Sequence, residues 1–159
     1  MNVTVICIGK LKERYWTEAV QEYSKRLSKY CTLTISELKE EKAPDNASAA
    51  EEAAVKEAEG RAILKQIKKE AYVIALEVQG KELTSESLSE RIASLGLSGK
   101  SDLVFVIGGS LGLSGEVLAR ADFRLSFSRM TFPHQMMRVI LLEQIYRSFK
   151  IIRNEVYHK

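Results

Sequence analysis

The amino-acid sequence predicts an α/β protein with a mostly parallel sheet and helices on both faces. Three observations support this fold class. Short β-branched and aliphatic runs alternate with helix-like runs from one end of the chain to the other. The 159 residues are 45% hydrophobic and 28% charged, which is ordinary for one globular unit with a buried core. No repeat, low-complexity tract or linker interrupts the alternation, so we expect residues 1–159 to form a single domain.

The first half of the chain predicts two strands and two helices. Residues 3–8 are a short β-branched run, typical of a buried strand. Residues 12–30 place apolar side chains at helical spacing, with Lys and Glu between them. Residues 32–38 alternate with a period of two, which favours a strand, and a polar loop follows. Ser48 is suited to cap the next helix, which is rich in Ala, Glu and Lys and runs to about Lys69.

The second half continues the alternation. The clearest strand in the chain is Leu-Val-Phe-Val-Ile at residues 103–107, because bulky β-forming residues follow one another without a break. The other expected elements are a strand over residues 72–78 that ends at Gln79-Gly80, a helix capped by Thr84 or Ser85 that ends near Leu95, a short helix over residues 114–120 and a strand over residues 123–127.

The last predicted helix begins near Pro133, which suits a first helical turn, and ends near Ile152. Its apolar residues cover most of the helix circumference. A helix that is apolar nearly all round must be buried on several sides. In so short a chain, we expect part of that surface to form a subunit interface and hence a homodimer.

Composition excludes several classes of protein. No apolar run approaches the roughly 20 residues that a membrane span needs, and the N-terminus has the pattern of a first strand rather than of a signal peptide. Cys7 and Cys31 lie in strand-like stretches without a partner at a metal-binding spacing. We therefore expect reduced, buried thiols, no metal and a cytoplasmic protein.

The net charge of +3 is unevenly distributed. Residues 129–159 carry six Lys and Arg against two Glu, whereas residues 37–59 carry eight acidic residues against three Lys. The basic end suits a partner that bears phosphates, and it equally suits an ordinary solvated helix face. Charge alone does not decide between the two.

Candidate ligand-binding residues gather where three predicted strands end. In open α/β sheets, ligands bind at the carboxyl ends of the strands. These ends are residues 76–80, 108–112 and 127–132. Paired glycines directly after a buried strand permit positive φ and let backbone N–H groups approach a ligand closely. The alternative is a tight turn that needs glycine for its geometry alone.

The same glycine run matches a serine-hydrolase motif. Gly108-Gly109-Ser110-Leu111-Gly112 fits the G-x-S-x-G nucleophile elbow, and it follows a strand as that motif requires. A hydrolase would need His134 or His158 as its base, and an acid to orient that base. The chain is short for the hydrolase fold and has no separate oxyanion motif, so this is the weaker hypothesis.

Several longer stretches together carry a family resemblance. They are Phe-Val-Ile-Gly-Gly-Ser at residues 105–110, Leu-Ser-Phe-Ser-Arg-Met-Thr-Phe-Pro-His at residues 125–134, Arg138-Val139, Glu-Gln-Ile-Tyr-Arg at residues 143–147, and the tail Tyr157-His158-Lys159. The chain resembles the ribosomal RNA large subunit methyltransferase H family, small SPOUT enzymes that methylate N3 of a pseudouridine in 23S rRNA. The resemblance covers essentially the whole chain. Leu111 departs from it, because a more polar residue is expected there.

The resemblance implies a fold detail and a cofactor that periodicity does not show. SPOUT proteins tie the C-terminal part of the chain into a trefoil knot, an exception to the rule against threaded loops, and bind S-adenosylmethionine there. The implied partner is 23S rRNA in the large subunit or the assembled ribosome. By position, the implied cofactor contacts fall at the same three strand ends, on Leu76, Gly108, Phe127, Ser128, Arg129, Met130, Thr131 and Phe132.

The family pattern and the chemistry together nominate Arg147, Tyr157 and His158 as catalytic residues. The weakly acidic N3–H of a uracil ring must lose its proton, so we expect His158 as base and Tyr157 as a stacking or hydrogen-bonding contact. Arg147 and Lys159 are expected to meet an anion or phosphate. Without the resemblance, the tail is interpreted as a frayed terminus, and His134 as structural. A non-catalytic RNA- or ribosome-binding module is the second functional hypothesis.

Overall fold

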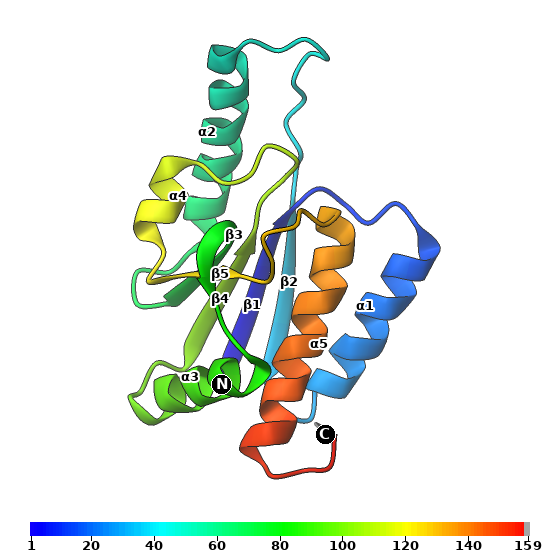
Figure 1. Ribbon diagram of the computed structural model, residues 1–159, viewed down its shortest axis with the longest axis vertical. Helices are drawn as coiled ribbons and strands as arrows, with labels where there is room; N and C mark the ends of the chain where they lie inside the picture. The colour runs from blue at the N-terminus through cyan, green and yellow to red at the C-terminus, as the bar shows by residue number, and fades with distance from the viewer. Residues whose placement is uncertain (158–159) are drawn as a thin grey trace.

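The computed structural model describes residues 1–157, in which strands and helices alternate as the sequence predicts (Figure 1). Each expected element is present, with ends that differ by a few residues. The elements are β1 (Asn2–Ile8), α1 (Arg14–Leu27), β2 (Thr32–Leu38), α2 (Ala49–Gln66), β3 (Tyr72–Glu82), α3 (Ser85–Leu97), β4 (Asp102–Ile107), α4 (Gly115–Arg120), β5 (Phe123–Ser126) and α5 (His134–Ile152).

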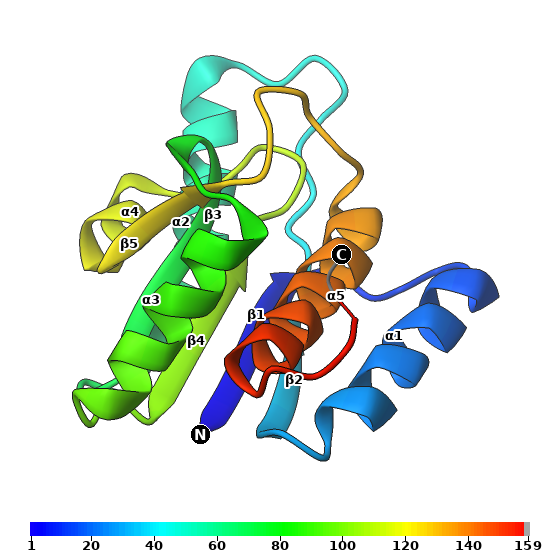
Figure 2. The same cartoon turned by 60° about the horizontal axis from the view of Figure 1, so that its bottom comes forward.

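The five strands form one parallel sheet in the order β2-β1-β4-β3-β5. Helices α1, α3 and α5 cover one face of the sheet, and α2 and α4 cover the other (Figures 1 and 2). The predicted α/β class, with a parallel sheet and helices on both faces, is therefore confirmed.

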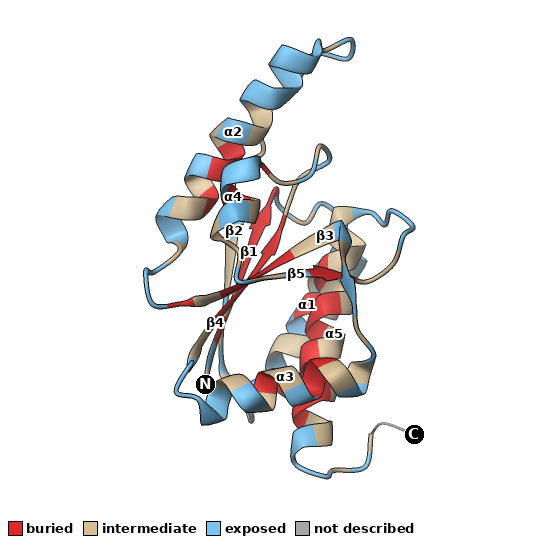
Figure 3. Ribbon diagram, turned by 60° about the vertical axis from the view of Figure 1, so that its left-hand side comes forward, coloured by how far each residue is buried: buried red, intermediate tan, exposed pale blue. Residues whose placement is uncertain are grey.

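Alternation along the central strands gives the sheet two hydrophobic faces. In β1, Val5 belongs to the cluster under α1, α3 and α5, whereas its neighbour Ile6 belongs to the cluster under α2 and α4. Both side chains are fully buried, and so is Phe105 in β4 (the buried strands are red in Figure 3). Each such aliphatic side chain contributes about 1.5–3 kcal/mol when it leaves water. The two cores hold the carboxyl ends of β3 and β4 in fixed positions.

Hydroxyl side chains cap three of the helices. Ser48, Thr84 and Ser114 each accept a hydrogen bond from the backbone N–H three residues further on, at the starts of α2, α3 and α4. Such a cap contributes about 1 kcal/mol, because it satisfies a donor that the first helical turn leaves unpaired. The cap at Ser114 also sets where the segment after β4 ends.

Strand β3 is longer than the sequence predicts. The pattern predicts its end at Gln79-Gly80, but the strand continues to Glu82. The reason is its neighbour β5, in which Leu125 pairs with β3 both before and after an irregularity in the register. A side-chain carbon at position 80 would lie 2.8 Å from the backbone of Arg124, so only glycine fits where the two strands meet.

Helix α5 is covered on several sides within a single chain. It packs between α1 and α3 on one face of the sheet (Figure 2). Leu142, in its middle, is fully buried and belongs to the core of the protomer. Since intramolecular packing accounts for most of the apolar circumference, that pattern does not require an interface, and the homodimer stays a prediction. A charge at Leu142 would disrupt the protomer itself.

The basic C-terminal end is largely neutralised by partners within the chain. Arg147 pairs with Glu143, and Lys150 pairs with Glu155. The Arg138 side chain is only 1% exposed. The charge pattern suggests either a phosphate-binding face or a solvated helix face. Both interpretations are wrong for Arg138, because its side chain is buried.

Within residues 1–157, no helix is both long and apolar enough to cross a membrane, and no three metal-ligating side chains gather. Both cysteines are free thiols. Cys7 is buried as expected, whereas Cys31 is only partly buried. Burial raises the pKa of each thiol to about 11, which keeps both protonated and unreactive at neutral pH.

Candidate functional site

A cavity of about 500 Å³ opens at the carboxyl ends of β3, β4 and β5. Its walls come from the end of β3, the turn after β4 and the segment after β5, and α2 and α5 add side chains from opposite faces of the sheet. The volume lies in the range of small-molecule sites. The structure thus brings together the three strand ends that the sequence singles out.

The wall after β4 is a tight turn from Gly108 to Gly112. Gly109 and Gly112 form an isolated antiparallel bridge, and Gly112 has a φ of 85°. A side-chain carbon at Gly108 would lie 2.9 Å from the backbone of Gly112, so close approach, rather than positive φ, requires glycine at position 108. At the tip, the N–H groups of Ser110 and Leu111 donate no hydrogen bond within the described residues, which leaves them available to a ligand.

The wall after β5 is held in place by serine hydroxyls. Ser126 Oγ lies 2.9 Å from the carbonyl oxygen of Val78 and 3.1 Å from that of Ser128. The hydroxyl of Ser128 in turn accepts a hydrogen bond from the backbone N–H of Met130 at 3.0 Å. Ser126 is buried, whereas Met130 is 74% exposed. This wall is therefore fixed where it leaves the sheet and open to solvent where Met130 is free to cover a bound molecule.

The cavity includes all but one of the cofactor contacts that the family resemblance implies. The exception is Arg129, whose side chain is 96% exposed and whose Nε lies 4.0 Å from Glu82 Oε1. Sequence position places Arg129 in the set, but its side chain lies outside the cavity. The residues that do line it are Leu76, Gly108, Phe127, Ser128, Met130, Thr131 and Phe132.

Other residues that line the cavity have little or nothing in the sequence pattern that marks them as site residues. His134, expected to be structural, lines it, and so do Met137 and Lys56. His134 adjoins the block at residues 127–132, which is the one signal that marks it. Lys56 belongs to a helix of repeated Ala, Glu and Lys, where nothing distinguishes a lysine at a cavity from a solvated one.

The structure brings Arg147 and Tyr157 together, but away from the cavity. Tyr157 Oη donates to Glu143 Oε1 at 3.1 Å, and the Arg147 guanidinium lies 4.7 Å from the centre of the Tyr157 ring. Burial, followed by the nearby Glu143 carboxylate, raises the pKa of Tyr157 to about 12, so the phenol stays neutral. Along the axis of α5, Arg147 lies about 20 Å beyond His134 at the cavity. His158 lies outside the described residues.

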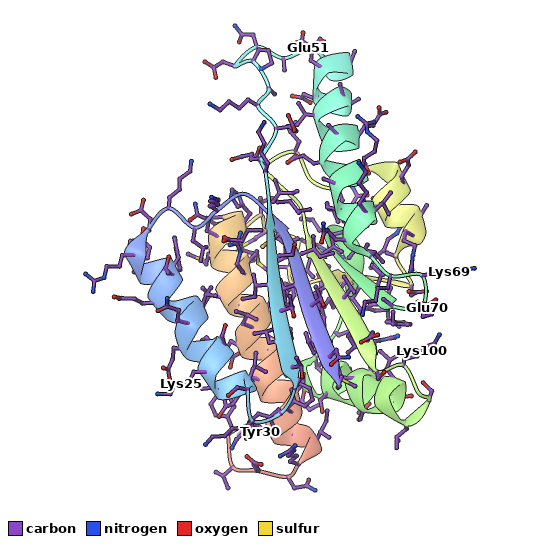
Figure 4. All side chains as sticks on the ribbon, turned by 180° about the vertical axis from the view of Figure 1, so that it is seen from behind. Lys25, Tyr30, Glu51, Lys69, Glu70 and Lys100 are labelled. Carbon is purple, nitrogen blue, oxygen red and sulfur yellow. The ribbon has the colours of Figure 1, made fainter. Side chains whose placement is uncertain are left out.

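The described part of the tail is packed rather than frayed. The Glu155 carboxylate accepts a hydrogen bond from Tyr30 Oη at 2.6 Å and pairs with Lys150. The Lys150 ammonium, and then the Tyr30 hydroxyl, hold the pKa of Glu155 below its usual value. Figure 4 shows Tyr30 near the end of α5, far from Glu51 at the start of α2. Tyr157, the one described residue of the tail, is held by Glu143 and Arg147, so the frayed-terminus interpretation is wrong for it, while residues 158 and 159 lie outside the described residues.

The glycine turn does not have the form of a nucleophile elbow. That motif places its serine on a sharp strand-to-helix turn. Here the turn closes on itself between Gly109 and Gly112, and α4 begins only at Gly115. The hydrolase hypothesis loses its structural basis.

Comparison with known proteins identifies the family of this chain. The model of a family described as "Predicted SPOUT methyltransferase" matches residues 1–158. The chain is 62% identical to the ribosomal RNA large subunit methyltransferase H of Clostridium novyi, 58% identical to that of Clostridium kluyveri and 57% identical to that of Clostridium beijerinckii. Each similarity extends over 159 residues and covers 100% of both chains. The chain therefore belongs to the SPOUT methyltransferase family, within its group of ribosomal RNA large subunit methyltransferase H proteins.

Proposed function

We propose that this protein transfers a methyl group from S-adenosylmethionine to N3 of a pseudouridine in 23S rRNA, in the large subunit or the assembled ribosome. The observation that carries the proposal is the single cavity that three distant segments of the chain form at the ends of β3, β4 and β5. The printed names of the full-length relatives support the reaction class. Because ribosomes are its substrate, the protein works in the cytoplasm.

The cavity suits S-adenosylmethionine. When bound, this cofactor supplies a methyl group on a positively charged sulfur. Leu76, Met130 and Phe132 offer apolar surface to its adenine and ribose, and the unbonded N–H groups at the tip of the glycine turn offer donors to the ring edge. Lys56, on the opposite side, suits a carboxylate. These features support the cofactor assignment.

Most of the chemical work is positioning, because methyl transfer is an in-line displacement. The target nitrogen must also lose its proton, so a base or a group that stabilises the ring anion accelerates the reaction. We assign the base to His158 and the anion-stabilising contact to Arg147. The neutral phenol of Tyr157 is suited to donate a hydrogen bond or to stack on a base.

We infer that the enzyme is a homodimer in which the C-terminal end of one protomer closes the cavity of its partner. Two observations support this. Arg147 and Tyr157 lie far from the cavity of their own chain, which leaves that site without its catalytic groups. The cavity mouth also exposes apolar side chains, with Val78 46%, Met130 74% and Phe132 37% exposed. An exposed apolar patch beside a site is typical of a surface that a partner covers.

We also propose that residues 1–159 form one domain whose C-terminal part is tied into the trefoil knot of SPOUT proteins. The path of the chain supports the knot. The segment after β5 starts at the edge of the sheet, where β5 pairs with β3. It then crosses to the sheet face covered by α1 and α3, and α5 packs between these two helices. The bulged end of β3, pinned by Ser126, lies along that path.

Analysis of 23S rRNA nucleosides tests the activity. In cells that lack this gene, mass spectrometry is expected to show the loss of one N3-methyl group from one pseudouridine, and the purified protein should restore it on isolated ribosomes with S-adenosylmethionine. A non-catalytic RNA- or ribosome-binding module would leave the methylated nucleoside in place. Such a module would also bind ribosomes without binding S-adenosylmethionine or S-adenosylhomocysteine.

Replacing Gly108 with Val tests the cavity as the cofactor site. The added side chain would lie within 3.1 Å of Gly112 and Leu113, so the turn must shift and its N–H groups must move away from the cofactor. We expect at least a 100-fold loss of S-adenosylmethionine affinity in calorimetry, on the order of 3 kcal/mol, with a native circular dichroism spectrum. Unchanged affinity would exclude this turn from the site. Gly115→Ala is the matched control, because a side chain there meets open space.

A further inference from the structure

A buried carboxyl group lies directly behind the glycine turn. Glu59 on α2 is only 4% exposed, and its Oε2 has no hydrogen-bond partner within the described residues. A side-chain carbon at Gly109 would lie 3.1 and 3.2 Å from the two carboxyl oxygens, so the carboxyl group packs against the backbone of the turn. Gly109 lines the cavity and Glu59 does not. One layer of backbone therefore separates this carboxyl group from the proposed cofactor.

The surroundings of Glu59 disfavour its charged form. The connection between β2 and α2 faces it with two further carboxylates, Glu40 and Glu41. Its own helix places Lys56 one turn earlier, but Lys56 lines the cavity, and no ion pair joins it to Glu59 within residues 1–157. The uncharged side chain of Ile8 in β1 packs against the same glycine of the turn. Burial, and to a lesser extent the two carboxylates, raise the pKa of Glu59 to about 7, while the backbone of Glu41 opposes the shift.

The protonation state of Glu59 matters because its carboxyl group packs against the glycine turn. A neutral carboxylic acid packs against Gly109 at little cost. An ionised carboxylate whose only donor among the described groups is the backbone of Glu41 is expensive to bury, and it attracts further N–H groups and water. The backbone of the turn packs against both carboxyl oxygens, and the proposed site needs the N–H groups of that turn on its cavity side. Filling the cavity with a ligand also removes water from the other face of the turn, which disfavours the ionised form further.

We infer that Glu59 is a positioning residue whose neutral carboxyl group supports Gly109 from behind and holds the glycine turn in the shape that receives the methyl donor. The inference rests on the proposed function, because it takes the ligand of the cavity to be S-adenosylmethionine or its product. Glu59 touches neither the cofactor nor the RNA, so it acts only through the turn.

Calorimetry with S-adenosylhomocysteine at pH 6 and pH 8 tests this role. If only the neutral form of a group with a pKa of about 7 permits binding, the wild type should bind roughly tenfold more weakly at pH 8 than at pH 6. Glu59→Gln keeps a neutral group of the same shape, so its affinity should be the same at both values. Glu59→Ala removes the support and should bind more weakly than Glu59→Gln at both. Glu57→Gln, exposed on the same helix, should behave as the wild type.

Each outcome is decisive. Glu59→Gln with the full tenfold fall in affinity would assign the pH dependence to another group and overturn the inference. Glu59→Ala with the affinity of Glu59→Gln would show that the turn needs no support, and overturn it too. In both cases the proposed function stands, because the wild type binds the ligand. A wild type that binds no S-adenosylhomocysteine at either pH overturns both proposals. Circular dichroism and thermal unfolding at each pH verify that the compared variants are folded.

Discussion

Deleting residues 156–159 is expected to abolish methyl transfer to ribosomes while dimerisation and S-adenosylmethionine binding stay nearly intact. The deleted segment contains Tyr157 and His158, which we assign to the chemistry, and none of its described residues lines the cavity of its own chain. Val156 is 89% exposed, and the contacts of Tyr157 lie towards the ends of α1 and α5, so we expect the deletion to cost little folding stability. The measurements are sedimentation, calorimetry and the initial rate on purified ribosomes.

Single substitutions separate the two proposed roles within the tail. His158→Ala should lower the methylation rate far more than it weakens cofactor binding, since a base acts mainly in the transition state. Tyr157→Phe keeps the ring beneath Arg147 and loses only the hydroxyl that donates to Glu143, so it should retain the fold of the tail. A truncated enzyme that methylates ribosomes at the wild-type rate would refute the catalytic assignment.

Mixing two inactive variants tests whether the tail acts on the partner's cavity. Gly108→Val has a damaged cavity and an intact tail, and the truncated chain has the reverse. In a mixed dimer with the tail acting across the interface, one intact cavity meets one intact tail. Random mixing should then recover about a quarter of the wild-type rate, because about half of the dimers are mixed and each has one working site. No recovery would place each tail on its own chain.

Replacing Arg138 with Met is expected to destabilise the protein by about 2–3 kcal/mol. The guanidinium is buried, donates to Glu37 Oε2 at 2.6 Å and to the carbonyl oxygen of Gly9 at 3.1 Å, and so joins α5 to the ends of β1 and β2. Removing it leaves the Gly9 carbonyl oxygen without its donor, and leaves Glu37 Oε2 with only the backbone N–H of Leu11 at 3.2 Å. The expected loss is smaller than the roughly 3–5 kcal/mol for a fully buried pair, because the Glu37 side chain is 36% exposed and regains some water.

Urea unfolding measures the change in the free energy of unfolding. Two control variants show whether that change comes from the buried contacts of Arg138. Arg14→Met breaks an ion pair to Glu18 whose side chains are 90% and 58% exposed, so the change should stay within about 0.5 kcal/mol of the wild type. Arg138→Lys keeps the charge but not the planar fork that reaches two acceptors, so it should also be destabilised. Wild-type stability in Arg138→Met would show that the buried contacts contribute nothing net.

The elements of the fold were predictable because short-range interactions set them. Residues 32–38 form a strand over the whole span that their period of two predicts. Ser48 caps α2 by accepting a hydrogen bond from Glu51 N–H three residues on, a contact that the local sequence contains in full. The carboxyl ends of β3, β4 and β5 meet in one cavity because parallel strands share their direction. Family membership could also be predicted from the sequence, since it depends on the order of residues alone.

Where the sequence misled, the missing information lay in another part of the chain. The end of β3 depends on pairing with β5, more than 40 residues later, and not on the turn-like Gln79-Gly80. Arg138 and Glu59 each stand in a helix where a charged side chain normally faces water, yet both are buried. Arg129 sits within a block of cavity residues with its side chain 96% exposed, so its cofactor contact stays a prediction.

The sequence by itself determined the α/β class, the family and most of the residues that line the cavity. Only the tertiary structure decided which charged groups leave water and how far the Arg147–Tyr157 pair lies from the cavity. The physical reason is that periodicity and capping act over a few residues, whereas burial, close approach at Gly108 and the pKa of Glu59 depend on segments brought together by packing. A side chain's neighbours across the fold, more than its neighbours along the chain, decide its charge and its role.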